Sequence, residues 1–180
     1  MPRQVFAFEP PDRFVAGTIG QPGERTFYLQ ATGGGRTVSV VLEKIQVAAL
    51  AERLGDLLDE AERRLGADVP EEPDDVDVDP LQTPVEEEFR VGTLGLAWDA
   101  ADSTVIVEAT ATAPDGEEGE EEVPEEDLDV LRVRLTPADT RAFVARALKL
   151  VAAGRPPCPF CGLPLDPAGH VCPRQNGYRR

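Results

Sequence analysis

All three cysteines and the only histidine of the chain lie within fifteen consecutive positions near its C-terminus. Cys158 and Cys161 are separated by two residues, a spacing at which both thiolates can bind one metal ion. His170 and Cys172 are two positions apart, so in an extended segment their side chains point the same way. Four ligands of these types fill the tetrahedral coordination of Zn²⁺ and leave no position for a substrate. The spacing therefore predicts a closed Cys3His zinc site with a structural role.

Other interpretations of this cluster stay open at the level of sequence. Zinc ribbons normally pair two C-x2-C knuckles across a longer gap, and the second half of this cluster is different. Cys158 and Cys161 could instead be a redox pair with a spare thiol, or the cysteines could be inert or form a disulfide. Asp166 could replace one ligand, although it lies in the turn predicted between the ligand pairs. Residues 154–180 are predicted to form a zinc-ribbon-like tail with zinc as its cofactor.

The rest of the chain offers few groups for catalysis. A zinc-bound His170 cannot serve as the base of a serine or cysteine nucleophile, and the chain has no other histidine. The sequence contains no P-loop, no dinucleotide-binding fingerprint and no HExxH motif. The polar residues that could line a cleft are Glu9, Asp12, Arg13, Glu43 and Lys44. The sequence leaves enzymatic activity undecided and favours a non-catalytic protein.

Charge is distributed unevenly along the chain, whose formal net charge is −16. Residues 155–180 contain four arginines and one aspartate, so they carry +3 and the remainder of the chain carries −19. A body this acidic repels phosphate backbones, which argues against nucleic-acid binding by the body. The basic tail could still contact a nucleic acid or an acidic partner.

The sequence shows neither a membrane-spanning run nor a signal peptide, and this bears on the cellular compartment that we expect. No apolar run approaches the length of about 20 residues that a membrane span needs. The first residues lack the apolar core and cleavage site of a signal peptide. We therefore expect a cytoplasmic protein without a membrane partner, and in the cytoplasm thiolates more often bind metal than form disulfides.

The elements that must position these residues come in two similar halves. Three pairs of segments match in the same order, at offsets of 75, 78 and 93 residues. The pairs are Phe14–Gly20 with Phe89–Gly95, Thr26–Thr32 with Thr104–Thr110, and Val40–Leu58 with Val133–Val151. A shared order is harder to obtain by chance than any single match. We interpret residues 1–153 as a duplicated body, with units at about 1–66 and 88–153.

Each unit is predicted to contain three strands followed by a helix. Strands are expected over Phe27–Ala31, Thr37–Leu42, Thr104–Thr112 and Leu128–Leu135, with a hairpin loop at Gly33–Gly35. The first helix is expected over Glu43–Leu65, with Ile45 and Leu65 among its apolar stripe and Gly66 as its C-cap. Thr136, Pro137 and Asp139 predict the start of the second helix, which Gly154 ends. The fold class is α+β, with an antiparallel sheet and two covering helices.

The segment between the units, residues 67–87, is rich in proline and acidic residues. This composition predicts a solvated linker without regular structure. Asp75, Asp77 and Asp79 alternate and could bind a cation, but the glycine and terminal glutamate of an EF-hand loop are missing.

Segments at both ends and in the first helix carry a resemblance to a known family. They are MPRQVFAFEPPDRFVAGTIG, LEKIQVAALAERL and CPFCGLPLDPAGHVCPRQNG. Together they resemble an uncharacterised family of actinobacterial proteins that end in this cysteine-rich element. The resemblance implies genes near those of mycothiol biosynthesis, a kinase-like protein as a neighbouring partner, and no catalytic residue.

A zinc-binding interaction or adaptor protein is the function that these observations favour. Two other functions stay open. One is an enzyme or small-ligand-binding protein that uses the groove between the units, and the other is nucleic-acid contact through the basic tail.

Overall fold

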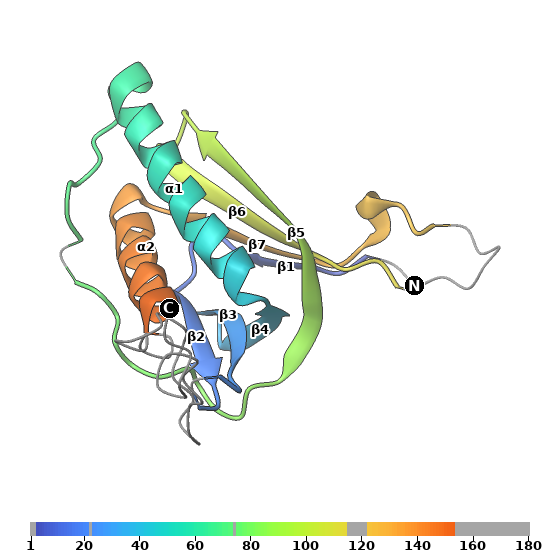
Figure 1. The fold of residues 1–180 in the computed structure, drawn as a ribbon. Coiled ribbons are helices and arrows are strands. Elements are labelled where there is room, and N and C mark those ends of the chain that lie inside the picture. Colours follow the sequence, from blue (N-terminus) through green and yellow to red (C-terminus); the bar gives the residue numbers. More distant parts are fainter. Residues whose placement is uncertain (1–2, 22, 74, 115–121, 154–180) are drawn as a thin grey trace, which may run out of the picture.

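The computed structural model describes residues 3–21, 23–73, 75–114 and 122–153 (Figure 1). These ranges contain a seven-stranded sheet and two helices, which lie side by side on one face of the sheet. The strands are β1 (Val5–Phe8), β2 (Arg13–Ile19), β3 (Thr26–Gly33), β4 (Arg36–Leu42), β5 (Glu87–Asp99), β6 (Thr104–Ala111) and β7 (Val130–Leu135). The helices are α1 (Lys44–Leu65) and α2 (Pro137–Ala152), with a short 3-10 helix η1 (Glu125–Asp127) before β7. The predicted zinc ligands and the predicted tail lie outside the described residues.

The sheet has the order β1-β7-β6-β5-β4-β3-β2, and it is mixed. Within each run of three strands the neighbours are antiparallel, as the sequence predicts. However, β4 pairs with β5 in parallel, and β1 pairs with β7 in parallel, so the prediction of an antiparallel sheet is wrong at these two places. The first arises because β4 and β5 are joined through α1, and a connection of that length permits parallel neighbours. The parallel pairing of β1 with β7 depends on the N-terminal strand reaching the edge of the sheet opposite β2.

Local signals define the start of α2 and the end of α1 as predicted, whereas Gly154, the predicted end of the second helix, lies outside the described residues. The Thr136 hydroxyl accepts a hydrogen bond from the Asp139 N–H at 3.1 Å, and Pro137 occupies the first position of α2. Gly66 adopts a φ of 63° at the end of α1, a conformation that glycine tolerates best. None of the described helices is long and apolar enough to cross a membrane.

The apolar stripe of α1 differs from the prediction at its two ends. Ile45 is 72% exposed and Leu65 is 60% exposed, whereas Val47 is fully buried. Val47 lies on the same side of the helix as Leu50, Leu54 and Leu58, three or four residues apart, which is the face that meets the sheet. Ile45 lies outside that face. Leu65 is the last residue of the helix, after the last buried position at Ala61.

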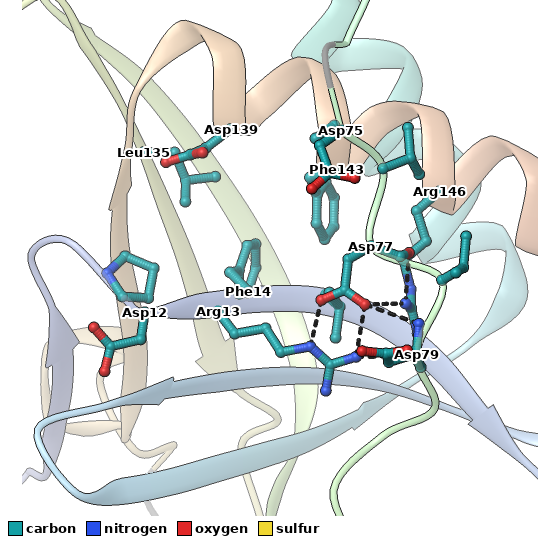
Figure 2. A pocket seen from close by; sticks show the side chains of 15 residues that line it. Asp12, Arg13, Phe14, Asp75, Asp77, Asp79, Leu135, Asp139, Phe143 and Arg146 are labelled. Carbon is teal, nitrogen blue, oxygen red and sulfur yellow. Dashed lines mark hydrogen bonds and ion pairs between the residues drawn. The ribbon is translucent and has the colours of Figure 1, made fainter.

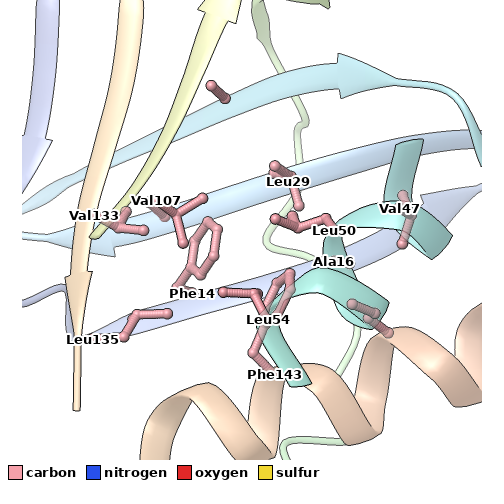
Figure 3. Packing of buried hydrophobic residues seen from close by; sticks show 14 of the residues in the cluster. Phe14, Ala16, Leu29, Val47, Leu50, Leu54, Val107, Val133, Leu135 and Phe143 are labelled. Atoms are coloured by element: carbon pink, nitrogen blue, oxygen red, sulfur yellow. The ribbon is translucent and has the colours of Figure 1, made fainter. Parts of the chain in front are cut away.

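The core fills the space between the helices and the sheet (Figure 3). The rings of Phe14 on β2 and Phe143 on α2 stack with centroids 4.7 Å apart. Leu50 and Leu54 of α1 lie beside them, opposite Leu29 of β3. Residues from both halves of the chain, Phe14 and Phe143, therefore meet in the centre of one shared core.

The pairing of the last two strands is the same in the two halves of the chain. Phe27 pairs with Leu42 in the first half, and Val105 pairs with Leu135 in the second, which is the pairing that offsets of 78 and 93 residues require. The two helices begin at Lys44 and Pro137, again 93 residues apart.

The first strands of the two halves do not keep the register that their sequence similarity implies. Phe27 pairs with Thr18, but its counterpart Val105 pairs with Trp98 rather than with Thr93. Strand β5 contains a register shift between Val91 and Thr93 and also pairs with β4, whereas β2 is an edge strand that pairs only with β3.

The described linker residues have no helix or strand before β5 begins at Glu87, close to the predicted end of the linker, but the linker is not simply solvated. Val69 and Leu81 are 6% and 5% exposed, so the linker contributes to the packed structure. It follows α2, passes the edge strand β2, and reaches the sheet face opposite the helices (Figure 1). There Leu81 lies against Gly17, where an added Cβ would meet the leucine side chain at 2.5 Å. The two apolar residues anchor a segment whose average composition predicts disorder.

Candidate functional site

A cavity of about 500 Å³ lies between β2, α2 and residues 75–79 of the linker (Figure 2). Strand β2 belongs to the first half of the chain and α2 to the second, so the cavity forms only when both halves and the linker come together. Its walls combine charged side chains with the apolar side chains of Phe14, Val15, Leu135 and Phe143.

Arg13 ties the linker to the edge of the sheet. Its Nε and Nη2 atoms donate to the two carboxylate oxygens of Asp77 at 2.6 and 3.0 Å. Nη2 also donates to the carbonyl oxygens of Asp79 and Pro80 at 2.8 and 3.1 Å. A two-pronged contact between guanidinium and carboxylate fixes orientation as well as distance. Arg13 thereby holds three linker residues, Asp77, Asp79 and Pro80, beside β2.

Arg146 of α2 approaches the same carboxylate from the opposite wall. Its Nη1 atom donates to the main-chain and side-chain oxygens of Asp77 at 2.7 and 3.1 Å. Its Nε atom donates to the carbonyl oxygen of Ala16 at 2.9 Å. The β2 edge is thus occupied by a side chain, which blocks one position for an added strand.

The two arginines determine the charge state of Asp77. Hydrogen bonds from Arg13 are the main cause that lowers the pKa of Asp77 below its ordinary value, against the opposing effect of burial. Burial lowers the pKa of the Arg146 guanidinium, and the Asp77 charge acts in the other direction. Asp77 is therefore an anion at neutral pH and cannot act as a general acid there.

The remaining charged groups make the cavity acidic. Its lining contains the five aspartates Asp12, Asp75, Asp77, Asp79 and Asp139, and the two arginines Arg13 and Arg146. Among the residues that the structure describes, the lining includes no serine, threonine, cysteine, histidine, lysine or tyrosine. With five carboxylates against two guanidinium groups, this lining attracts basic groups.

Replacing Asp77 by asparagine is expected to lower the free energy of unfolding by about 1–2 kcal/mol at pH 7, because both arginines lose their anion. The pKa of Asp77 is lowered by folding, so its contribution is present above the unfolded pKa and is lost as the pH falls through the folded value. The difference between wild type and Asp77→Asn should therefore shrink below about pH 4. Urea unfolding of both proteins at pH 7 and pH 3.5 measures this difference in the free energy of unfolding.

Glu60→Gln is the matched control for this prediction, because Glu60 pairs with Arg64 on the exposed surface of α1. Its expected effect is below about 0.5 kcal/mol at either pH. A loss at Asp77 no larger than the loss at Glu60 would contradict the role assigned to the Arg13–Asp77–Arg146 cluster.

The structure separates the polar residues that the sequence suggested for one cleft. Asp12 and Arg13 line the cavity described above, and Glu9 does not. Glu43 and Lys44 line a different cavity of about 320 Å³, at the start of α1. The predicted grouping of these residues is therefore wrong, because β2 and the start of α1 present them in different places.

Sequence reasoning missed Arg146 and the pairing of Asp77. Arg146 is three residues after Phe143, so it occupies the apolar face of α2, and its side chain is only 13% exposed. A charged residue on an apolar helix face was the signal that could have identified it. Asp77 itself gave no such signal, because it lies among many acidic residues.

The described residues contain no candidate metal-binding cluster. Among these residues, no three side chains of histidine, cysteine, aspartate or glutamate come together in a way that could hold a metal ion. The carboxylate of Asp77 is engaged by arginines instead. The predicted ligands Cys158, Cys161, His170 and Cys172 lie outside the described ranges, so the zinc site stays a prediction.

Comparison with known proteins identifies the family of the chain. Residues 6–172 match the family described as protein of unknown function (DUF3090), and this range includes all four predicted zinc ligands. No curated protein and no solved structure matches the chain. Because the match extends over nearly the whole sequence, the chain belongs to the DUF3090 family.

Proposed function

We propose that this protein is a non-catalytic zinc-binding module that recognises another protein. The observation that carries the proposal is the ligand set Cys158, Cys161, His170 and Cys172, which fills the coordination of Zn²⁺ and leaves no open position. The family match includes these residues, so the cysteine-rich segment is part of the family's common sequence range.

The body is proposed to have arisen by duplication of a βββα unit. Equal registers of β3–β4 and β6–β7 support this, as do helices that begin 93 residues apart. A duplicated unit normally retains its local pairing while its edges adapt to new neighbours. The different register of β2 and β5 fits that pattern, because only β5 has neighbours on both sides.

The proposed partner is a protein of the cytoplasm, with the kinase-like neighbour suggested by the family resemblance as the first candidate. The strongly acidic body disfavours a polyphosphate partner, since like charges repel. Affinity purification from native cytosol with the full chain and with a chain ending at residue 153 tests this. A partner retained only by the full chain supports the proposal, and repeated failure to retain any protein counts against it. Salt-sensitive retention of RNA instead would favour the nucleic-acid function.

Purified protein is expected to contain about one zinc ion per chain, as a Cys3His site holds a single ion. Cys161→Ser should abolish stoichiometric zinc, because three remaining ligands bind Zn²⁺ more weakly. Inductively coupled plasma mass spectrometry gives the metal content, and circular dichroism shows whether the body stays folded. Asp166→Asn is the control and should retain zinc. Full zinc in the Cys161→Ser protein would show that the ligand set is wrong.

A further inference from the structure

We propose that the cavity between β2, α2 and residues 75–79 is the docking site of the chain's own C-terminal segment, residues 154–180. The inference concerns where this segment binds, and it does not depend on whether the segment holds zinc. Three properties of the structure support it: the charge of the cavity, the apolar part of its lining, and its distance from the end of α2.

Charge complementarity is the first argument. Among the described residues, Asp12, Asp75, Asp79 and Asp139 make no ion pair, while both arginines of the cavity are engaged by Asp77. The cavity therefore presents unpaired carboxylates to whatever binds there. The C-terminal segment contains four arginines and one aspartate and follows a body of charge −19. It is the most basic part of the chain, and the cavity attracts basic groups.

The apolar part of the lining gives the second argument. Phe14 and Phe143 meet at the base of the cavity, with Leu135 nearby (Figure 2). Arginine side chains bury their methylene groups against such surfaces while the guanidinium reaches an anion at the rim. The C-terminal segment also contains apolar residues, among them Phe160, Leu163 and Leu165. A segment with both kinds of side chain matches both kinds of lining.

Distance is the third argument. Asp139, Phe143 and Arg146 line the cavity from α2, and the C-terminal segment begins directly after this helix. The axial distance from Arg146 to the end of the helix is about 9 Å at 1.5 Å per residue. An extended chain covers that distance in about three residues, so the segment is long enough for any of its later side chains to reach the cavity.

Covalent attachment also favours this segment over a free partner. A tethered ligand experiences an effective concentration of about 1 mM or more when its linker spans the distance easily. A free basic peptide would have to reach a comparable concentration to compete. This physical advantage is why we assign the cavity to the C-terminal segment and not to a separate protein or a second copy.

Site-specific photo-cross-linking of the full chain tests the proposal. A benzophenone amino acid is introduced at Ala142, which lines the cavity, and in a second protein at Ala49, which lines a different cavity beside β5. Both positions are half-buried on helices, so they are matched in environment. Irradiation at position 142 should yield cross-links to residues 154–180 within one molecule, and position 49 should yield none. Mixing labelled and unlabelled protein distinguishes links within a chain from links between chains.

The carboxylates are tested in the position-142 protein by Asp75→Asn combined with Asp139→Asn. Loss of two exposed ion pairs should reduce the yield of the cross-link by about fivefold. Raising the salt concentration to about 1 M should reduce it as well, because exposed charges are then screened. Circular dichroism confirms that each protein is folded. The proposal is overturned if position 142 links only to other parts of the body or only between chains, or if the yield is unaffected by the two substitutions.

Discussion

Replacing Phe143 by alanine is expected to lower the free energy of unfolding by about 3–5 kcal/mol, the range for removal of a buried phenylalanine. Phe143 is 3% exposed, and its ring stacks on Phe14 with an interplanar angle of 11°. The substitution removes the contact that joins α2 to β2 and leaves a void that surrounding side chains fill only in part. The two halves of the body should consequently lose a large part of their mutual stabilisation.

Urea unfolding, followed by circular dichroism, measures this loss. Leu148→Ala is the matched control, because Leu148 lies on the same helix but is 49% exposed. Its expected effect is about 1 kcal/mol or less, since only part of its surface is buried. Comparable losses for the two variants would show that the Phe14–Phe143 contact is not a centre of the core.

The second large effect is expected for Gln30→Leu, which should destabilise the protein by about 2–3 kcal/mol. The Gln30 side chain is 1% exposed, and its amide donates to the Ser39 hydroxyl and to the Gln82 carbonyl oxygen, each at 3.1 Å. Its own oxygen accepts a hydrogen bond from the Gln82 N–H at 2.8 Å. Leucine has a similar size but leaves these groups without partners, and a buried polar group without a partner costs free energy.

Gln30 holds the linker against the sheet through the main chain of Gln82. The substitution should therefore also weaken the protection of the linker backbone at Gln82. Hydrogen exchange of the Gln82 amide should become faster in Gln30→Leu than in the wild type, in addition to the change in urea unfolding. Thr37→Val is the control, because Thr37 is exposed and its hydroxyl donates to the side chain of Gln82 at 2.8 Å without contacting the linker backbone. It should change stability by less than about 1 kcal/mol and leave the Gln82 amide protected. Unchanged exchange in Gln30→Leu would contradict the proposed anchoring.

Much of the local structure could be predicted because its causes are local. The hairpin after β3 turns at Gly34 and Gly35, which have positive φ values of 60° and 77° that glycine accepts at little cost. Thr136 and Pro137 start α2, and Gly66 ends α1, since the main-chain groups at helix ends need particular neighbours. Each of these features depends on residues within a few positions of one another.

The candidate site in the body could be predicted only in part. Asp12 and Arg13 were identified, but their proposed neighbours Glu43 and Lys44 lie at another cavity. Arg13 instead meets Asp77, which is 64 residues away in the chain, and Asp77 meets Arg146 after a further 69. Pairs so distant in sequence leave no periodic signal.

Short-range patterns in the sequence were sufficient to locate the helices, most of the strands and the similarity between the halves. The same kind of pattern predicts a metal-ligand set confined to residues 158–172. Short-range spacing is sufficient for each of these, because helical periodicity, strand alternation, caps and chelation act over a few residues. Three features follow only from long-range packing: β4 and β5 run parallel, the linker passes around β2, and Arg13, Asp77 and Arg146 share one cavity. These outcomes depend on which sheet edges and helix faces meet, and that is set by the packing of the whole core.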